Sequence, residues 1–133
     1  MQRYITIMTV EDDGFTFLIP DLPGFMAQCE GDDATAAMAE AQEVLGHFLG
    51  AMRDRGLDIP APSGPGAVLD SRAWTDHAAS SILTHLDARP IGGRPVRVNI
   101  SMDSYTLDAI DSSAAARGLT RSAYLAEAAR QYG

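Results

Sequence analysis

Three polar side chains near the carboxyl end of the chain have the types and the spacing needed to read DNA bases. Arg97, Asn99 and Ser101 alternate with four apolar residues, Val96, Val98, Ile100 and Met102. Because successive side chains of a β-strand point to opposite faces, a strand here would bury the apolar set and present the polar set. Arginine and asparagine make bidentate hydrogen bonds to guanine and adenine in the major groove. The segment therefore predicts a base-reading strand.

A single strand cannot do this alone, so the segment also indicates how the chain assembles. The major groove admits a two-stranded ribbon, and an isolated strand would leave its backbone and its apolar face unsatisfied. Residues 94–102 therefore predict a homodimer in which two chains pair these strands. The alternative is an ordinary edge strand with solvated polar residues, since alternation by itself is common.

Two amphipathic helices are predicted directly after the strand. Asp103 is a candidate N-cap for the first helix, over about residues 104–117, and Gly118 is suited to a left-handed C-cap. This helix has apolar residues at helical spacing, at Leu107, Ile110 and Ala114. The second helix is predicted over about residues 121–131.

The start of the second helix is a candidate phosphate contact. Thr120 is placed to cap it, and the amides of Arg121 and Ser122 would lie at the positive end of the helix dipole. We therefore expect Thr120, Arg121 and Ser122 to bind DNA phosphates. Under the alternative, Thr120 only caps the helix.

Two runs of residues in the tail carry a family resemblance. They are Arg-Val-Asn-Ile-Ser-Met, which begins at Arg97, and Gly-Leu-Thr-Arg-Ser-Ala-Tyr-Leu at 118–125. With the capped helix between them, they resemble a ribbon-helix-helix domain of the Arc and MetJ type over nearly all of residues 94–133. The resemblance implies an obligate intertwined dimer whose antiparallel ribbon enters the major groove of operator DNA. Arg97, Asn99 and Ser101 would then be the base readers.

The first half of the chain predicts a compact α/β unit. Two alternating strands, residues 4–10 and 15–19, are joined by a hairpin turn, and a third strand follows at 25–30. Asp33 is a candidate N-cap for a long helix that ends at Gly56. The apolar stripe of this helix should lie on the sheet, with Ala34, Met38, Ala41, Leu45, Phe48 and Met52.

The middle of the chain gives weaker signals. A Pro/Gly-rich stretch at 59–66 is expected to separate two lobes. Residues 68–77 are a candidate short helix carrying Trp74, which either packs within the chain or anchors an interface. Residues 80–86 are a candidate fourth strand that returns to the front sheet, and residues 87–95 predict an irregular linker.

A Pro-Asp-Leu-Pro-Gly run at 20–24 is the sharpest local signature of the first half, and by itself it indicates a rigid turn. Other marked runs are Asp-Gly-Phe-Thr-Phe at 13–17, Gly-Asp at 31–32 and Ile-Pro-Ala-Pro-Ser at 59–63. Together with the alanine-rich helix, these runs resemble the front domain of HicB antitoxins, a shortened relative of the ribonuclease H fold.

The two resemblances together imply an α+β protein of the HicB family of type II antitoxins. Residues 1–88 would form the ribonuclease H-like front domain, with three to four strands and one long helix. Residues 94–133 would form the ribbon-helix-helix dimerisation domain. The implied function is to bind and neutralise a HicA-type toxin that cleaves messenger RNA, and to repress the antitoxin's own operon. The toxin-contact residues are not indicated, and pairing of dimers into tetramers is left open.

The charge is unevenly distributed along the chain. The net charge is −8, and residues 1–65 hold three arginines against eleven carboxylates, whereas residues 94–133 hold five against four. An acidic lobe repels nucleic acid and attracts a basic protein, although such a surface can simply aid solubility. Specific DNA contact is therefore expected only through the tail.

The composition argues against several other classes of protein. Cys29 is the single cysteine, and no Cys/His cluster has metal-ligand spacing, so neither disulfides nor a metal site is expected. The acidic residues at 11–13 fall in a turn rather than on strands, and we expect no catalytic residues and no cofactor. With no secretory or membrane-spanning segment expected, the prediction is a cytoplasmic protein. The alternative function is a free-standing ribbon-helix-helix repressor whose front domain senses a ligand or oligomerises.

Overall fold

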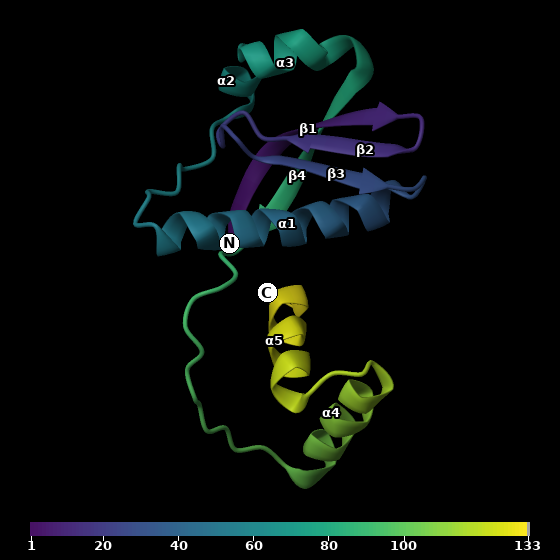
Figure 1. Cartoon of the computed structure of the whole chain (residues 1–133), viewed down its shortest axis with the longest axis vertical. Coiled ribbons are helices and arrows are strands. Elements are labelled where there is room, and N and C mark those ends of the chain that lie inside the picture. Colours follow the sequence, from purple (N-terminus) through teal and green to yellow (C-terminus); the bar gives the residue numbers. More distant parts are fainter. Residues whose placement is uncertain (133) are drawn as a thin grey trace. The chain divides into compact units, whose positions relative to one another are not determined.

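The computed structural model describes residues 1–132; Gly133, the last residue of the predicted tail domain, lies outside the described residues. The chain divides into two compact units, one covering Met1–Gly93 and one that begins at Arg94 (Figure 1). All four strands of the described chain belong to the first unit.

A four-stranded antiparallel sheet forms the centre of the first unit. Its strands are β1 (Gln2–Glu11), β2 (Gly14–Leu18), β3 (Met26–Glu30) and β4 (Ser81–Ala88), in the spatial order β3-β2-β1-β4. β1 pairs on both sides, because Met8 lies opposite Phe17 of β2 and opposite Ile82 of β4. The three front strands and the returning fourth strand predicted from the sequence are confirmed, with small shifts at their ends. With its helices, the chain is α+β.

The long helix α1 (Ala34–Asp54) covers one face of this sheet (Figure 1). Asp33 starts the helix, since its carboxylate accepts hydrogen bonds from the amides of Thr35 and Ala36 at 3.0 and 3.2 Å. After its last turn, Gly56 takes a φ of 70°, a left-handed conformation that favours glycine. The predicted helix and its N-cap are confirmed.

The hydrophobic core lies between α1 and the sheet. The sheet contributes Tyr4, Met8, Phe15, Phe17, Ala27, Cys29, Leu86 and Ala88, and α1 contributes Ala37, Ala41, Leu45 and Leu49. Of the predicted stripe, Ala41 and Leu45 lie in the core, and the other members are partly buried and pack against it: Ala34, Met38, Phe48 and Met52. The prediction that this stripe faces the sheet is confirmed. Ala37, Ala41, Leu45 and Leu49, at four-residue steps, therefore form the buried face of α1.

Two short helices cover the opposite face of the sheet (Figure 1). They are α2 (Pro65–Leu69) and α3 (Arg72–His77), followed by the 3-10 turn η1 (Ala78–Ser80). Ile5 and Ile7 of β1 point away from α1 because they alternate with the core residues of that strand, and both are buried. Val68 of α2 is buried as well, and α3 contacts β1. β1 is therefore covered on both faces of the sheet.

The single helix predicted over residues 68–77 is wrong, because Ser71 divides it. The Ser71 hydroxyl donates to the carbonyl oxygen of Val68 at 2.6 Å and accepts the amide of Trp74 at 3.2 Å. Ser71 thus caps the end of α2 and the start of α3. Serine side chains can do this because they form hydrogen bonds with nearby backbone groups in place of the helical ones. Trp74 is half-buried on α3.

Hydrogen bonds join the segment after α1 to β1 and to the loop that follows β2. The Asp21 carboxylate accepts the amide of Ser63 at 2.8 Å and its hydroxyl at 2.5 Å. The Tyr4 hydroxyl donates to the carbonyl oxygen of Pro60 at 2.6 Å. The expectation that residues 59–66 separate two lobes is therefore wrong, since this stretch belongs to the first unit.

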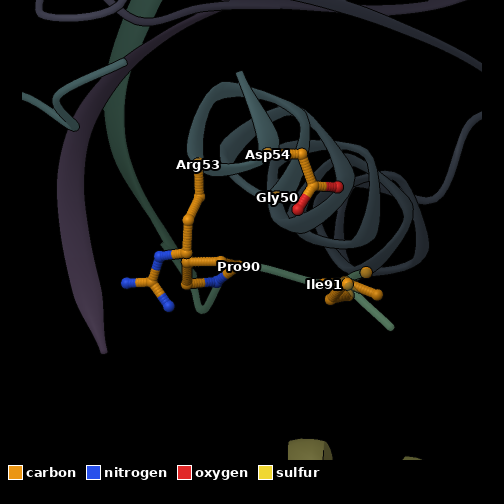
Figure 2. A pocket seen from close by; sticks show the side chains of 7 residues that line it. Gly50, Arg53, Asp54, Pro90 and Ile91 are labelled. Carbon is orange, nitrogen blue, oxygen red and sulfur yellow. The ribbon is translucent and has the colours of Figure 1, made fainter. Parts of the chain in front are cut away.

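The residues that follow β4 dock on α1. The Ile91 amide donates to the Gly46 carbonyl at 2.8 Å. A Cβ added at Gly50 would lie 1.8 Å from the Ile91 carbonyl oxygen, so only glycine leaves room there; Figure 2 shows Ile91 beside the helix. Glycine weakens a helix, and this close approach accounts for its presence in the middle of α1. Residues 89–93, the strap, thus belong to the first unit although they form no helix or strand.

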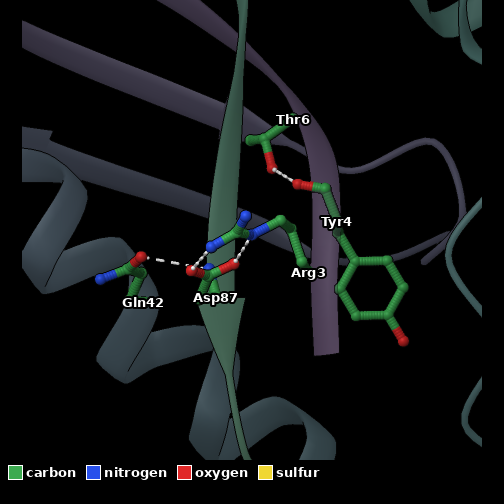
Figure 3. Close-up of polar contacts among 5 residues, drawn as sticks. All are labelled: Arg3, Tyr4, Thr6, Gln42 and Asp87. Atoms are coloured by element: carbon green, nitrogen blue, oxygen red, sulfur yellow. Dashed lines mark hydrogen bonds and ion pairs between the residues drawn. The ribbon is translucent and has the colours of Figure 1, made fainter. Parts of the chain in front are cut away.

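Side chains from three elements meet at the end of β4 (Figure 3). Arg3 donates from Nε and Nη2 to the two carboxylate oxygens of Asp87, at 2.8 and 2.9 Å. These hydrogen bonds hold the pKa of Asp87 below its usual value. Gln42 of α1 accepts the amide of Asp87 at 3.1 Å, which occupies an edge-strand N–H that could otherwise pair with another chain.

The second unit contains two helices, α4 (Ser104–Ala116) and α5 (Arg121–Tyr132). Asp103 caps α4 by accepting the amide of Thr106 at 2.8 Å and its hydroxyl at 2.7 Å. Gly118 has a φ of 67° and follows the end of α4. Both predicted helices and the predicted residues that start and end α4 are confirmed.

Candidate nucleic-acid interface

The segment predicted to read DNA bases lies exposed in the single chain. Val96, Val98 and Ile100 have relative exposures of 76%, 70% and 64%, which is unusual for large apolar side chains so close together in sequence. The alternating polar side chains are exposed as well: Arg97, Asn99 and Ser101. Residues 94–103 form no helix or strand in the single chain, so base reading by these side chains stays a prediction.

The start of α5 is capped as the sequence predicts. The Thr120 hydroxyl accepts the amide of Ala123 at 3.1 Å, and the Thr120 carbonyl accepts the amide of Tyr124 at 2.9 Å. The capping role given to Thr120 is therefore confirmed. The amides of Arg121 and Ser122 precede the first amide that has an intrahelical acceptor, so they can serve an outside acceptor. Phosphate binding by these residues stays a prediction.

Two contacts across the turn at Gly118 fasten α4 to α5. Arg121 donates from Nε and Nη2 to the two carboxylate oxygens of Asp111, at 2.8 and 2.9 Å. These hydrogen bonds lower the pKa of the Asp111 carboxyl. The guanidinium carbon of Arg117 lies 5.7 Å from the centre of the Tyr124 ring, within the range of a cation–π contact. The candidate phosphate-binding arginine is thus already held by a carboxylate.

Sequence reasoning missed the pair between Asp111 and Arg121. The two residues are ten positions apart, and the spacing rules for ion pairs on one helix do not apply across a turn. The turn at Gly118 was the available signal, because a chain that reverses there brings the end of one helix beside the start of the next.

Several acidic residues of the first unit are engaged in local hydrogen bonds. Glu11 accepts the hydroxyl of Thr16 at 2.9 Å, Asp21 binds Ser63, and Asp33 caps α1. Within residues 1–132, no group of three or more His, Cys, Asp or Glu side chains could hold a metal ion.

The strap borders a small pocket at the end of α1 (Figure 2). Its lining includes Gly50, Arg53, Asp54, Pro90 and Ile91, and its volume is about 70 Å³. This volume is well below that of pockets that hold a small-molecule ligand. Across residues 1–132, the structure contains no helix with the length and hydropathy of a transmembrane span.

Comparison with known proteins assigns the chain to a family. The family model described as the HicB-like antitoxin of bacterial toxin-antitoxin systems matches residues 4–129. The chain belongs to the HicB-like antitoxin family. This family is a class of antitoxins rather than of enzymes. Among curated proteins, none matches the chain significantly.

Solved HicB structures share the fold of this HicB-like chain. The Burkholderia pseudomallei antitoxin HicB is 23% identical over 99% of this chain and 98% of its own, with a TM-score of 0.51. A crystal structure of antitoxin HicB3 is 26% identical over 98% of this chain and 97% of its own, with a TM-score of 0.53. A chain in the HicA3 and HicB3 toxin-antitoxin complex is 20% identical over 67% of this chain and 100% of its own, with a TM-score of 0.54.

Proposed function

We propose that this HicB-like protein neutralises a HicA-type toxin that cleaves messenger RNA, and that it represses its own operon. Its front domain, of shortened ribonuclease H-like fold, binds the toxin and blocks access to the messenger. Residues 94–133 form a ribbon-helix-helix dimer that binds operator DNA. Both activities take place in the cytoplasm, where the messenger and the operator are found.

Family membership is the observation that carries the antitoxin role, because the match over residues 4–129 includes most of both units. A toxin partner for the front domain is supported by the HicA3 and HicB3 complex, one chain of which aligns over 67% of this chain. Charge supports the same partner: three arginines against eleven carboxylates in residues 1–65 would attract a basic protein and repel bare RNA.

The exposed alternating segment supports the DNA-binding role. Val96, Val98 and Ile100 would be covered if a second chain paired with this segment, and the two-chain ribbon would gain the backbone hydrogen bonds that a lone strand lacks. Arg97 and Asn99 would then share the uncovered face of the ribbon with Ser101. Thr120, Arg121 and Ser122 at the start of α5 would meet the phosphates that flank the bases.

The toxin partner can be tested in vitro with a short basic protein encoded beside this chain. Cleavage of a messenger RNA by that protein should stop when this chain is added in equal amount. Cleavage that continues at the same rate would overturn the antitoxin proposal. If the chain still bound its operator, the alternative of a free-standing repressor with a ligand-sensing or oligomerising front domain would take its place.

The DNA-binding role can be tested with two arginine variants on a set of single-base operator variants. Arg97→Ala should lose about 1–3 kcal/mol of discrimination at one position in each half-site, because a bidentate arginine distinguishes guanine from the other bases. Arg121→Ala should weaken binding to all the single-base operator variants alike and make it less dependent on salt, because a phosphate contact carries no base information. An Arg97→Ala variant with unchanged affinity and base preference would exclude the ribbon as the reader.

A further inference from the structure

An ion pair lies beside the proposed phosphate contact. Arg121 holds both carboxylate oxygens of Asp111, at 2.8 and 2.9 Å. The two side chains are partly exposed, Arg121 at 54% and Asp111 at 44%, so a DNA backbone can reach the pair. A guanidinium has five N–H donors, and the bidentate pair uses two of them. Three donors remain for a phosphate while the carboxylate fixes the orientation of the group.

The other acidic residues of this unit have different surroundings. The Asp103 carboxylate is occupied by the cap of α4. Glu127 accepts the side-chain amide of Gln131 at 3.3 Å. Asp108, which like Asp111 lies on α4, has no partner among the described residues. Asp111 is therefore the acid of residues 94–132 that is seen to hold an arginine.

We propose that Asp111 is a positioning residue for DNA binding through Arg121, an inference that rests on the proposed DNA-binding function. The negative charge of Asp111 repels every phosphate that approaches Arg121, whatever the DNA sequence. The fixed guanidinium offsets this repulsion only where a phosphate lies in line with its free N–H donors. This is the case when the protein is seated on its operator. Asp111 thus raises the ratio of operator binding to non-specific binding.

The matched pair of variants for this inference is Asp111→Asn and Asp108→Asn. Each removes one negative charge from the same helix, but only the first removes the contact to Arg121. Full-length proteins are titrated at two salt concentrations against two duplexes of equal length: the region upstream of the gene and a shuffled sequence of the same composition. Both readouts are dissociation constants.

Asp111→Asn should bind the shuffled duplex more tightly and should lower the ratio of operator to shuffled affinity, by up to about fivefold for a surface pair. Asp108→Asn should tighten binding to both duplexes alike and leave the ratio unchanged, because it removes charge without releasing Arg121. Asp111→Glu keeps the charge and a carboxylate, so it should keep a ratio closer to that of the wild type.

Equal ratios in Asp111→Asn and Asp108→Asn would overturn the inference while leaving the DNA-binding proposal in place, because Asp111 would then act only through its charge. A wild-type chain that binds both duplexes alike would overturn the DNA-binding proposal and this inference with it.

Discussion

Replacing Gly50 with alanine should release the strap from α1 and leave the rest of the first unit folded. The added Cβ would lie 1.8 Å from the carbonyl oxygen of Ile91 and 2.8 Å from its carbonyl carbon, so the strap backbone must move. This removes the hydrogen bond to Gly46 and part of the burial of Ile91, at a cost of about 1–2 kcal/mol. Alanine in place of glycine stabilises the helix by about 1 kcal/mol. The free energy of unfolding should therefore change by no more than about 1 kcal/mol.

Hydrogen exchange at the Ile91 amide reports the strap directly. The wild-type amide is bonded and should exchange slowly, whereas in Gly50→Ala it should exchange at least about tenfold faster. Gly46→Ala should have a smaller effect on this amide, because its Cβ would meet the Ile91 side chain at 2.6 Å, which can rotate away, and the Arg89 carbonyl oxygen only at 3.0 Å. Gly66→Ala adds a Cβ in open space and should have no effect on this amide. Wild-type protection of Ile91 in a folded Gly50→Ala chain would refute the docking of the strap.

Three further variants test other contacts. Asp21→Ala removes both hydrogen bonds to Ser63 and should destabilise the first unit by about 1–3 kcal/mol in urea unfolding; an unchanged midpoint would show that these contacts contribute no net stability. Asp87 has a lowered pKa in the folded chain, so its pairing with Arg3 stabilises the fold above about pH 4 and is lost as the pH falls through that lowered pKa. In Asp87→Asn the free energy of unfolding should therefore fall less steeply than in the wild type as the pH is lowered into the acid range. An equally steep fall in the two proteins would contradict this linkage. Val98→Asp places a charge on the proposed buried face of the ribbon and should convert a dimer to a monomer in sedimentation, whereas a persistent dimer would count against the ribbon.

Local signals in the sequence predict most of the helices and strands. Alternation predicts β1 and β2, weaker patterns indicate β3 and β4, and the family resemblance favours β4. The capping aspartates at 33 and 103 predict where α1 and α4 begin. The failures have local causes too. One serine, Ser71, forms hydrogen bonds on both sides and divides a predicted helix into two. The proline-rich stretch at 59–66 has the composition of a linker, but Asp21 binds Ser63 within it. No local pattern in the sequence indicates that contact.

The contacts that position the candidate sites join residues without a common periodicity. Asp21 and Ser63 are 42 residues apart, and no spacing rule links them. Gly46 and Gly50 are four residues apart on one helix face, which could have indicated a close approach but not that Ile91 makes it. The partner of the proposed ribbon cannot be found in the pattern of one chain, because its backbone hydrogen bonds would go to a second chain.

The antitoxin role is tested most directly by the growth of cells that express the neighbouring toxin together with a fragment of this chain. Residues 1–93 contain the complete sheet, α1 and the strap, so the fragment should fold and restore growth without the tail. Full-length Arg97→Ala should also restore growth while losing repression of the operon, because Arg97 belongs to the other unit. Growth that stays arrested although the fragment is folded would contradict a division of labour between the two units.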